Sequence, residues 1–577
     1  MPNQRMNRAL LLVPLGAALL VWSHPQPAHA CGGFFCNRPP PDGTLPIAQA
    51  AENVLFVLGR DAASGANTVE AHIQILYTGP ASEFSWIVPV TSVPTVTVGS
   101  DILFDRIEPP TRPSFQVTYQ MEGNCQSSGV GAGCGSSAGG AAYSPGFGGV
   151  VDAGTGGVDV LSRGSAGPFE YVVVRSEDGA TLRTWLTTNN YFVSPEAAAL
   201  VDEYVAGQFS FVALRLQVGQ DTSAIRPIVL RMTANEACLP LKLTAIAATP
   251  DLRINVWVLA NARAVPINYA EVSINQARLD WFNSGRNYDQ LLKDAANEAE
   301  GNAFAVEYVM PAANSLPWFT VPPGARSQLT SSTTPPAFVQ ALASLGFQPT
   351  GAVLQLLRKH IPIPATVAAR GVTEAMFYGS IASYWSSDNA AFAPFNASAA
   401  AADFDTDILV PLDSYRTLFS RSGRLTRLAT FISPEEMNSD PLFVTNTSLP
   451  DVAPQHMAIA HVMCGDNGDP CDSPVRMQME DGREVGYSPT SCMQYARGQL
   501  DQMPAAEVAY QRGADGEGQI SLDNRAAIMS AVRAHNSSIA FPQQGGCGCS
   551  VGGSPGILLL LFVAGVIALS LRRHRRR

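Results

Sequence analysis

The chain lacks the short motifs that usually reveal a catalytic chemistry. No H-E-x-x-H pair of histidines is present, and the acidic turn at 466–469 lacks the twelve-residue loop and the closing Glu of an EF-hand. Cys31 and Cys36 have four residues between them, so they do not form a C-x-x-C redox pair. We also find no internal repeat. Composition, patterning and the two chain ends therefore carry most of the information.

Two matches to the G-x-S-x-G nucleophile elbow occur, at 135–139 and 552–556. The elbow needs a buried strand before the serine and a helix after it. The first match lies in a stretch rich in Gly, Ser and Ala, and the second lies beside a terminal apolar run. Neither has the required context, so the sequence predicts no catalytic residue and no cofactor.

One cluster could hold a metal ion, and it lies in the last quarter of the chain. His456 and His461 precede Cys464, with Asp466, Asp469 and Asp472 nearby. The two histidines are five residues apart, so they would not lie on one helix face as i, i+4 ligands do. A disulfide explains Cys464 better, and a solvated acidic loop explains the aspartates better. We therefore assign no metal ligand, and zinc or calcium remains the alternative.

Positive charge is scarce away from the chain ends. Only three lysines occur in 577 residues, and the formal net charge is −11. Without Arg5, Arg8 and the five arginines within 572–577, the chain keeps 30 basic residues against 48 acidic ones, a charge of −18. So acidic a surface repels nucleic acid and anionic lipid, which excludes a nucleic-acid partner.

The N-terminus predicts export. Arg5 and Arg8 precede an apolar stretch at 9–21, and Ala28-His29-Ala30 provides an A-x-A cleavage site after Ala30. The mature chain would then begin at Cys31. A cysteine there also allows a lipoprotein, although Ala28 stands where leucine is usual, so ordinary cleavage is favoured.

The C-terminus predicts membrane attachment. Cys547 and Cys549 lie in a Gly-rich hinge, followed by the apolar run 557–571 and then the arginines. Fifteen residues span about 22 Å as a helix, which is short against a hydrocarbon core of about 30 Å. The arginines stay cytoplasmic, so the bulk of the chain lies on the other side. A plain stop-transfer anchor is the alternative.

This tail resembles the MYXO-CTERM sorting signal of myxobacterial surface proteins. The resemblance implies a sorting protease as partner and a cysteine before the helix as the point of processing and attachment. Cys547 and Cys549 both qualify. We expect the protein at the cell envelope or outer surface, anchored in the membrane through its C-terminal region.

The remaining cysteines fit an oxidising compartment, because their number is even. Closeness in sequence favours the pairs Cys31–Cys36, Cys125–Cys134 and Cys464–Cys471, which leaves Cys238–Cys492 by elimination. The eight disulfide candidates are Cys31, Cys36, Cys125, Cys134, Cys238, Cys464, Cys471 and Cys492.

Hydrophobic periodicity predicts an α+β fold. Val69 to Tyr77 alternates as a strand does, and so do the stretches 212–218 and 252–258, whereas 195–205, 288–299, 337–344 and 352–360 read as helices. We expect a β-rich N-terminal part with a mixed α/β continuation, then a mainly helical region, in a disulfide-stabilised ectodomain with one C-terminal transmembrane helix. The expected segments are a signal peptide at 1–30, an α+β domain at 31–310 with a Gly-rich loop at 123–167, a helical continuation at 311–462, a Cys-containing loop-rich region at 463–544, and a sorting signal at 545–577 with its helix at 557–571.

Several stretches of the ectodomain resemble the DUF2330 family of exported bacterial proteins. They are 31–36, 49–52, 83–90, 185–186, 190–191, 425–428 and 433–437. The likeness runs from Cys31 to about Val462 and implies one exported architecture without an assigned activity. We therefore expect a binding protein for an unknown surface ligand, or a component that contacts another envelope protein. A secreted hydrolase and a purely structural envelope protein are the alternatives.

Overall fold

The computed structural model describes residues 48–78, 85–125, 157–191, 193–217, 225–246, 248–492 and 494–542. The predicted signal peptide, most of the Gly-rich loop and the sorting signal lie outside these residues. Within the described residues, no helix is long and apolar enough to span a bilayer. The predicted transmembrane helix at 557–571 remains a prediction, because it lies outside them.

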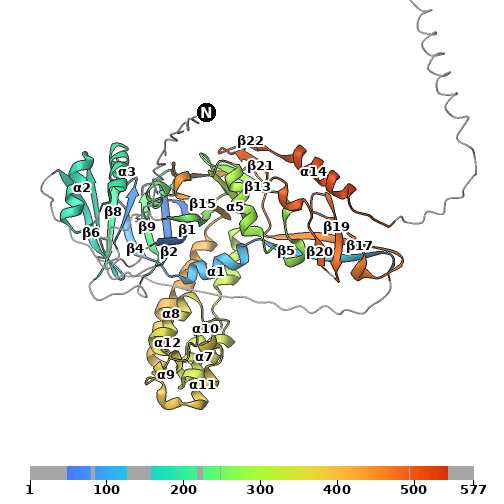
Figure 1. The fold of residues 1–577 in the computed structure, drawn as a ribbon. Coiled ribbons are helices and arrows are strands. Elements are labelled where there is room, and N and C mark those ends of the chain that lie inside the picture. Colours follow the sequence, from blue (N-terminus) through green and yellow to red (C-terminus); the bar gives the residue numbers. More distant parts are fainter. Residues whose placement is uncertain are drawn as a thin grey trace, which may run out of the picture.

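A ten-stranded mixed sheet forms the centre of the molecule (Figure 1). Its strand order is β22-β21-β13-β14-β15-β11-β1-β2-β9-β4. Most side chains of the central strands are apolar on both faces, since each face is covered by another layer. The strands are β1 (Ala48–Arg60), β2 (Asn67–Thr78), β4 (Thr95–Val98), β9 (Ile228–Thr233), β11 (Ala248–Ala260), β13 (Ala270–Ile274), β14 (Ala303–Pro311), β15 (Arg424–Ile432), β21 (Ala506–Gln511) and β22 (Gln519–Asp523).

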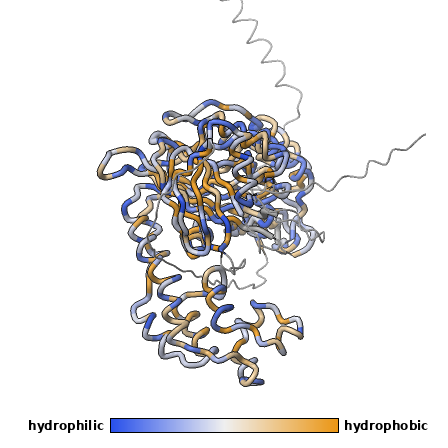
Figure 2. Tube along the Cα trace, turned by 90° about the vertical axis from the view of Figure 1, so that its left-hand side faces the viewer, coloured by the Kyte–Doolittle hydropathy of each residue, from blue (hydrophilic) through white to orange (hydrophobic). Residues whose placement is uncertain are grey.

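A four-stranded antiparallel sheet packs on one face of the central sheet. Its order is β3-β8-β7-β6, with β3 (Ser85–Val90), β6 (Val158–Ala166), β7 (Phe169–Ser176) and β8 (Ser210–Leu216). Trp86 and Leu214 face Val54 and Phe56 in one shared core. Figure 2 shows these hydrophobic strands gathered in the body of the molecule. The strand β6 corrects the predicted loop at 123–167, since its residues 158–166 pair with β7.

Two helices, α2 (Gly179–Thr188) and α3 (Pro195–Ala206), cover the outer face of the smaller sheet. The predicted start of α3 is confirmed. The hydroxyl of Ser194 accepts a hydrogen bond from the backbone N–H of Ala197 at 3.2 Å, and Pro195 occupies the first helical turn, where its missing N–H costs nothing.

The other face of the central sheet is covered by a helical insertion, which we define as residues 312–420. It leaves the sheet after β14 and returns at β15, and it projects from the sheets in Figure 1. Helix α1 (Ile102–Thr111) lies between the insertion and the strands. The helices of the insertion are α6 (Ala325–Ser331), α7 (Pro335–Ser344), α8 (Gly351–His360), α9 (Ala365–Ala368), α10 (Glu374–Gly379), α11 (Ile381–Ser387), α12 (Ala397–Phe404) and α13 (Val410–Ser420).

This topology corrects the predicted helical region at 311–462. The helices end at Ser420, and the next segment, β15, pairs with β11 on one side and β14 on the other. The insertion therefore interrupts the sheet and does not follow it. Its helices bury apolar side chains against Leu55 and Trp257 of the sheet.

A five-stranded sheet of order β20-β19-β18-β17-β5 forms the far end of the molecule. It corrects the predicted loop-rich region, because most of 455–537 is regular structure. The elements are β5 (Ser114–Cys125), β17 (Gln455–Gly468), β18 (Val475–Gln478), β19 (Glu484–Ser491), β20 (Gln494–Ala496) and α14 (Arg525–Ser537). The remaining short elements are β10 (Ala237–Cys238), β12 (Arg263–Pro266), β16 (Leu442–Asn446), α4 (Leu241–Thr244) and α5 (Tyr288–Glu298).

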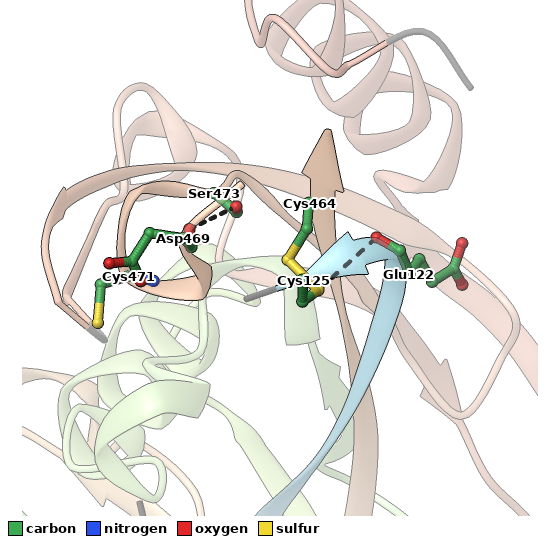
Figure 3. The surroundings of a disulfide bond; sticks show 6 residues. All are labelled: Glu122, Cys125, Cys464, Asp469, Cys471 and Ser473. Atoms are coloured by element: carbon green, nitrogen blue, oxygen red, sulfur yellow. Dashed lines mark hydrogen bonds between the residues drawn. A yellow bond between two sulfur atoms is a disulfide. The ribbon is translucent and has the colours of Figure 1, made fainter. Parts of the chain in front are cut away.

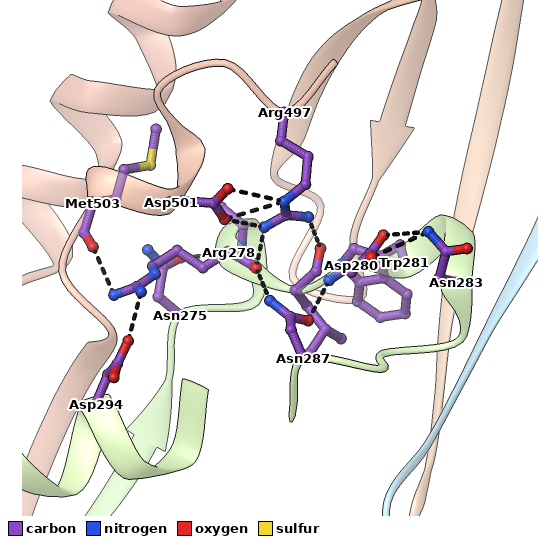
Figure 4. A network of polar contacts seen from close by, with 12 residues as sticks. Asn275, Arg278, Asp280, Trp281, Asn283, Asn287, Asp294, Arg497, Asp501 and Met503 are labelled. Carbon is purple, nitrogen blue, oxygen red and sulfur yellow. Dashed lines mark hydrogen bonds and ion pairs between the residues drawn. The ribbon is translucent and has the colours of Figure 1, made fainter. Parts of the chain in front are cut away.

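A polar network fastens this C-terminal part to the segment around α5 (Figure 4). Arg497 donates to the carbonyl oxygens of Arg278 and Leu279 and pairs with Asp501. Arg278 donates to the carbonyl oxygen of Met503 at 3.1 Å and to the carboxylate of Asp294 at 2.7 Å. These hydrogen bonds join residues 497–503 to residues 278–294, so we interpret the network as structural.

Candidate functional site

A row of polar side chains crosses the central sheet beneath the helical insertion. Five neighbouring strands, β14, β15, β11, β1 and β2, contribute one residue each. Asn53 lies opposite both Asn255 and Gln74, and Arg427 lies opposite Trp257, two residues along the strand from Asn255. Because side chains alternate between the faces of a strand, these polar side chains lie on the same face of the sheet. The members are Glu307, Arg427, Asn255, Asn53 and Gln74, in that strand order.

Each member of the row contacts the next. Arg427 pairs with Glu307 at 2.7 Å and donates to Asn255 Oδ1 at 3.2 Å. Asn255 donates to Asn53 Oδ1, and Asn53 donates to Gln74 Oε1, both at 2.9 Å. The row runs across the strands from β14 to β2, the third strand from the β4 edge of the sheet.

The charged end of the row is fully enclosed. The side chains of Arg427 and Glu307 are both 0% exposed. Burial lowers the pKa of Arg427, and the charge of Glu307 acts in the opposite direction. Tyr288 donates its hydroxyl to Glu307 at 2.8 Å, and the ring of Trp257 lies 5.0 Å below the guanidinium. Buried charges persist only when paired and hydrogen-bonded, and this pair meets that condition.

The opposite end of the row opens into a charged cavity. Gln74 donates to Asp101 Oδ1 at 2.7 Å, and Asp101 lines a cavity of about 70 Å³ between the sheet and the insertion. Four segments far apart in sequence supply the lining: the loop before α1, the residue pair before β9, helix α8 and the turn η6 (Asp405–Leu409). The lining residues are Ser100, Asp101, Arg226, Ala352, Gln355, Leu356, Lys359 and Asp407.

The side-chain amide of Gln355 bridges an acid, Asp101, and a base, Arg226. Its Nε2 donates to Asp101 Oδ2 at 3.3 Å, and its Oε1 accepts from the guanidinium of Arg226. Burial raises the pKa of Asp101, while the hydrogen bond from Gln74 and the charge of Arg226 lower it. The side chain of Asp101 is therefore desolvated but surrounded by oriented donors.

The outer part of the cavity carries a second acid and a second base. Burial raises the pKa of Asp407, and the charge of Arg226 lowers it. Lys359, one helical turn after Gln355, pairs with Asp403 at 2.6 Å but keeps 64% of its side chain exposed. An exposed pair of this kind contributes little to stability, so Lys359 can exchange Asp403 for another anion at small cost.

The position of α8 depends on a glycine. Gly351 has a φ of +47°, and a Cβ there would lie 1.9 Å from the carboxylate of Asp105. The missing side chain lets Asp105 Oδ2 accept a hydrogen bond from the backbone N–H of Ala352 at 3.1 Å. This contact fixes the first turn of α8 beside α1, which places Gln355 and Lys359 along the cavity.

The disulfide pairings predicted from sequence are wrong for the described cysteines. Cys125 bonds Cys464, with a Cα–Cα distance of 5.2 Å (Figure 3). Cys471 bonds Cys492. The reason for the first bond is the parallel pairing of β5 with β17, which brings together residues 339 positions apart. The predicted pairs Cys125–Cys134, Cys464–Cys471 and Cys238–Cys492 therefore do not form.

Cys238 is a free cysteine beside a small apolar cavity of about 40 Å³ between the ten-stranded and the four-stranded sheet. Burial raises its pKa to about 12, and the charge of Asp440 adds to the effect. A thiol is nucleophilic as the thiolate, so this side chain is unsuited to nucleophilic catalysis.

The histidines of the possible metal cluster do not converge. His461 Nδ1 lies 2.6 Å from a carboxylate oxygen of Glu122, whereas His456 Nδ1 lies 3.1 Å from Glu480. Cys464 is occupied by its disulfide. Across the described part of the chain, no group of three or more His, Cys, Asp or Glu side chains could hold a metal ion.

Other predicted site residues lie outside the described residues. They are Ala30, Cys31, Cys36, Cys134, Cys547 and Cys549, together with both G-x-S-x-G matches. Their roles in processing, anchoring and cross-linking remain predictions.

Sequence reasoning missed the cavity because its members come from four unrelated segments. A signal was nevertheless present in the strands. Asn255 lies between Ile254 and Val256, and Arg427 interrupts the apolar run of β15. Charged or amide side chains at inward positions of central strands are costly unless partnered, so they indicate a polar network.

The chain matches the profile of the DUF2330 family, described as an uncharacterized protein conserved in bacteria, over residues 30–319. The chain belongs to this family. The match contains Asp101 and Arg226 but ends before α8, so it does not extend to Val462 as expected.

No curated protein matches the chain. Among solved structures, the chain is similar to the crystal structure of baculovirus P35, with 9% identity and a TM-score of 0.20 over 40% of this chain and 76% of that one. A likeness at this TM-score carries no argument about fold or function.

Proposed function

We propose that this protein is an exported component of the cell envelope that binds a small polar ligand in the charged cavity. The observation that carries the proposal is the convergence of two acids, two bases and an amide on one cavity. Ligand sites are typically concave and hold a few oriented polar groups, and this cavity has both properties.

Export and anchoring are supported by the chain ends and the cysteines. Disulfides persist in oxidising compartments, and two of them join described cysteines. In this proposal the chain is cleaved after Ala30, a sorting protease acts at Cys547 or Cys549, and the 557–571 segment engages the membrane. Family membership is compatible with these steps but assigns no activity.

Binding fits the cavity better than catalysis does. The free thiol is protonated and lies elsewhere, and Asp101, the buried acid of the cavity, already accepts hydrogen bonds from Gln74 and Gln355. Such preorganised groups suit the recognition of a charged ligand, because the free-energy cost of desolvating and orienting them is met during folding and not on binding.

The binding part of the proposal is tested by thermal unfolding with glycine, glucose and inorganic phosphate as three chemically distinct probes. At one hundred times its Kd a ligand adds about 2.7 kcal/mol of stability, which raises Tm by several degrees. We expect at least one probe to raise Tm in the native protein and to lose that effect in Asp101→Asn. The matched control is Asp413→Asn, an exposed carboxylate on α13. No rise with any probe would contradict the proposal and favour a purely structural role.

The export part is tested separately by intact mass spectrometry of the protein from the envelope of its native host. We expect a mass without residues 1–30 and without the segment after the cysteine hinge. A mass that retains 557–571 would replace the sorting signal with a plain membrane anchor.

A further inference from the structure

A second cavity lies at the far end of the molecule, between helix α14 and the strands β19 and β20 (Figure 1). Its volume is about 370 Å³, about five times the 70 Å³ of the charged cavity. Pockets for small ligands typically measure about 300–1,000 Å³, so this cavity has the size of a ligand site. We call it the neutral cavity, because none of its lining residues is Asp, Glu, Lys or Arg. The lining residues are Ser488, Ala496, Gly498, Gln499, Ala534, His535, Ser538 and Ile539.

The neutral cavity forms at the junction of a strand and a helix. Strand β20 pairs with β19 from Ser488 to Ser491. Before that point the last turn of α14 takes over: Asn536 donates to the carbonyl oxygen of Glu484 and accepts from the N–H of Gly486, both at 2.8 Å. The end of β20 and the end of α14 therefore meet along β19, and the neutral cavity is the space left between them.

His535 is the buried polar side chain of this cavity, with 5% of its surface exposed. Its Nε2 lies 2.8 Å from the carbonyl oxygen of Gly486. Because a carbonyl oxygen can only accept, Nε2 carries the proton, and Nδ1 of the neutral ring is a hydrogen-bond acceptor. Nδ1 lies on the side of Gly498, another lining residue, and none of the described residues donates to it. The imidazole therefore presents a fixed acceptor to the cavity.

Gly498 keeps the space in front of this acceptor open. Its φ is +56°, in the left-handed region that glycine adopts without strain. A Cβ at this position would lie 3.2 Å from Cε1 of His535 and 3.4 Å from its Nδ1. The missing side chain therefore leaves Nδ1 accessible to a ligand.

Three more lining side chains can form hydrogen bonds. The hydroxyl of Ser538 donates to the carbonyl oxygen of His535 at 2.6 Å, so its lone pairs stay available to a donor. The hydroxyl of Ser488 and the amide of Gln499 can each donate and accept, and neither is bonded to another side chain among the described residues. A ligand group that both donates and accepts, such as a hydroxyl, matches this set.

We infer that the neutral cavity binds an uncharged, hydroxyl-rich molecule, the chemical class of neutral sugars. One hydroxyl of the ligand donates to Nδ1 of His535, and its neighbours exchange hydrogen bonds with Ser488 and Gln499. The C–H groups of the ring lie against the aliphatic side chains of the lining. The inference goes beyond the proposed function, because it concerns a different cavity.

Other ligand classes fit less well. A charged ligand would lose hydration without meeting an opposite charge in the lining. Arg497, next to Gly498 in the chain, already pairs with Asp501. A purely apolar ligand would leave Nδ1 of His535 without a partner. An extended peptide adds to a sheet through free backbone groups, but the N–H and the carbonyl of Gly486 are already bonded.

The test is isothermal titration of the full mature protein with glucose and N-acetylglucosamine, beside glucosamine and glucuronate, which add one positive or one negative charge to the sugar. We expect at least one of the neutral sugars to bind, and both charged sugars to bind at least about tenfold more weakly. Absence of binding by both neutral sugars, or equal binding by a charged one, would overturn the inference.

Variants place the binding in the neutral cavity. His535→Gln keeps a side-chain N–H for the carbonyl of Gly486 but removes the ring acceptor, so we expect it to weaken sugar binding at least about tenfold. Gln499→Ala changes an exposed side chain, so it tests the cavity without a risk to folding; we expect a loss of about threefold. Gln519→Ala, at an exposed glutamine on β22, is the matched control and should bind as the native protein does.

The outcomes separate this inference from the proposed function. If a sugar binds equally well to His535→Gln, Gln499→Ala and the native protein, the neutral cavity is not its site and the inference fails. If its binding is lost in Asp101→Asn instead, the sugar belongs to the charged cavity, which supports the proposed function and overturns this inference. If N-acetyl-trialanine amide binds in a His535-dependent manner and no sugar does, the assigned ligand class is wrong.

Discussion

Asp105 should make the protein less stable at neutral pH than in mild acid. Burial raises its pKa from 3.8 to about 6, the charge of Asp101 adds to the rise, and the N–H of Ala352 opposes it. The charges of Arg106 and Glu108 act on the same carboxyl, in opposite directions. The folded protein therefore holds this proton more tightly than the unfolded chain does.

The sign and size of the effect follow from linkage. Below about pH 4 the carboxyl is protonated in both states and contributes nothing. As the pH rises from about 4 to about 6, only the unfolded chain releases the proton, so the free energy of unfolding falls. A shift of about 2 pKa units at about 1.4 kcal/mol each gives a loss of up to about 3 kcal/mol above pH 6.

The variant Asp105→Asn removes this loss and keeps an oxygen that accepts from Ala352. We expect its free energy of unfolding in urea to exceed that of the native protein by up to about 3 kcal/mol at pH 8 and to match it near pH 4. Asp413→Asn, on the exposed side of α13, should show no such pH dependence. An Asp105→Asn variant that is less stable than the native protein at pH 8 would refute the reasoning.

Two further changes test how the sheets are held together. Glu307→Gln should lower the free energy of unfolding by about 3–5 kcal/mol, because it leaves the charge of Arg427 buried without its partner. Asp451→Asn, which breaks an exposed pair with Arg424, should lower it by less than about 1 kcal/mol. Equal effects of the two variants in urea unfolding would contradict the role of the buried pair. Cys125→Ser should lower the free energy of unfolding by about 2–5 kcal/mol, because it removes the disulfide to Cys464. The measurement is the urea midpoint under oxidising conditions, and an unchanged midpoint would show that the bond is dispensable.

Local features of the fold were predictable from the sequence. The alternation of Val69 to Tyr77 gives β2, and Ser194 with Pro195 gives the start of α3. Both depend on interactions among residues close in the chain. Ala458, Ala460 and Val462 also alternate as the residues of a strand do, although we expected a helical region up to residue 462.

Long-range pairings were not predictable in the same way. The bond between Cys125 and Cys464 depends on a parallel pairing of strands separated by most of the chain, and closeness in sequence favours other partners. The cavity has the same origin, since Asp101, Arg226 and Gln355 meet only after the helical insertion packs on the sheet. No spacing pattern in the sequence indicates such a contact between distant segments.

The most direct test of the charged cavity as a binding site is a crystal structure of the mature protein soaked in turn with glycine, glucose and inorganic phosphate. The account predicts density in the cavity lined by Asp101, Arg226 and Gln355 for the probe that raises Tm. Density for that probe at another surface, with only water in the cavity, would contradict it.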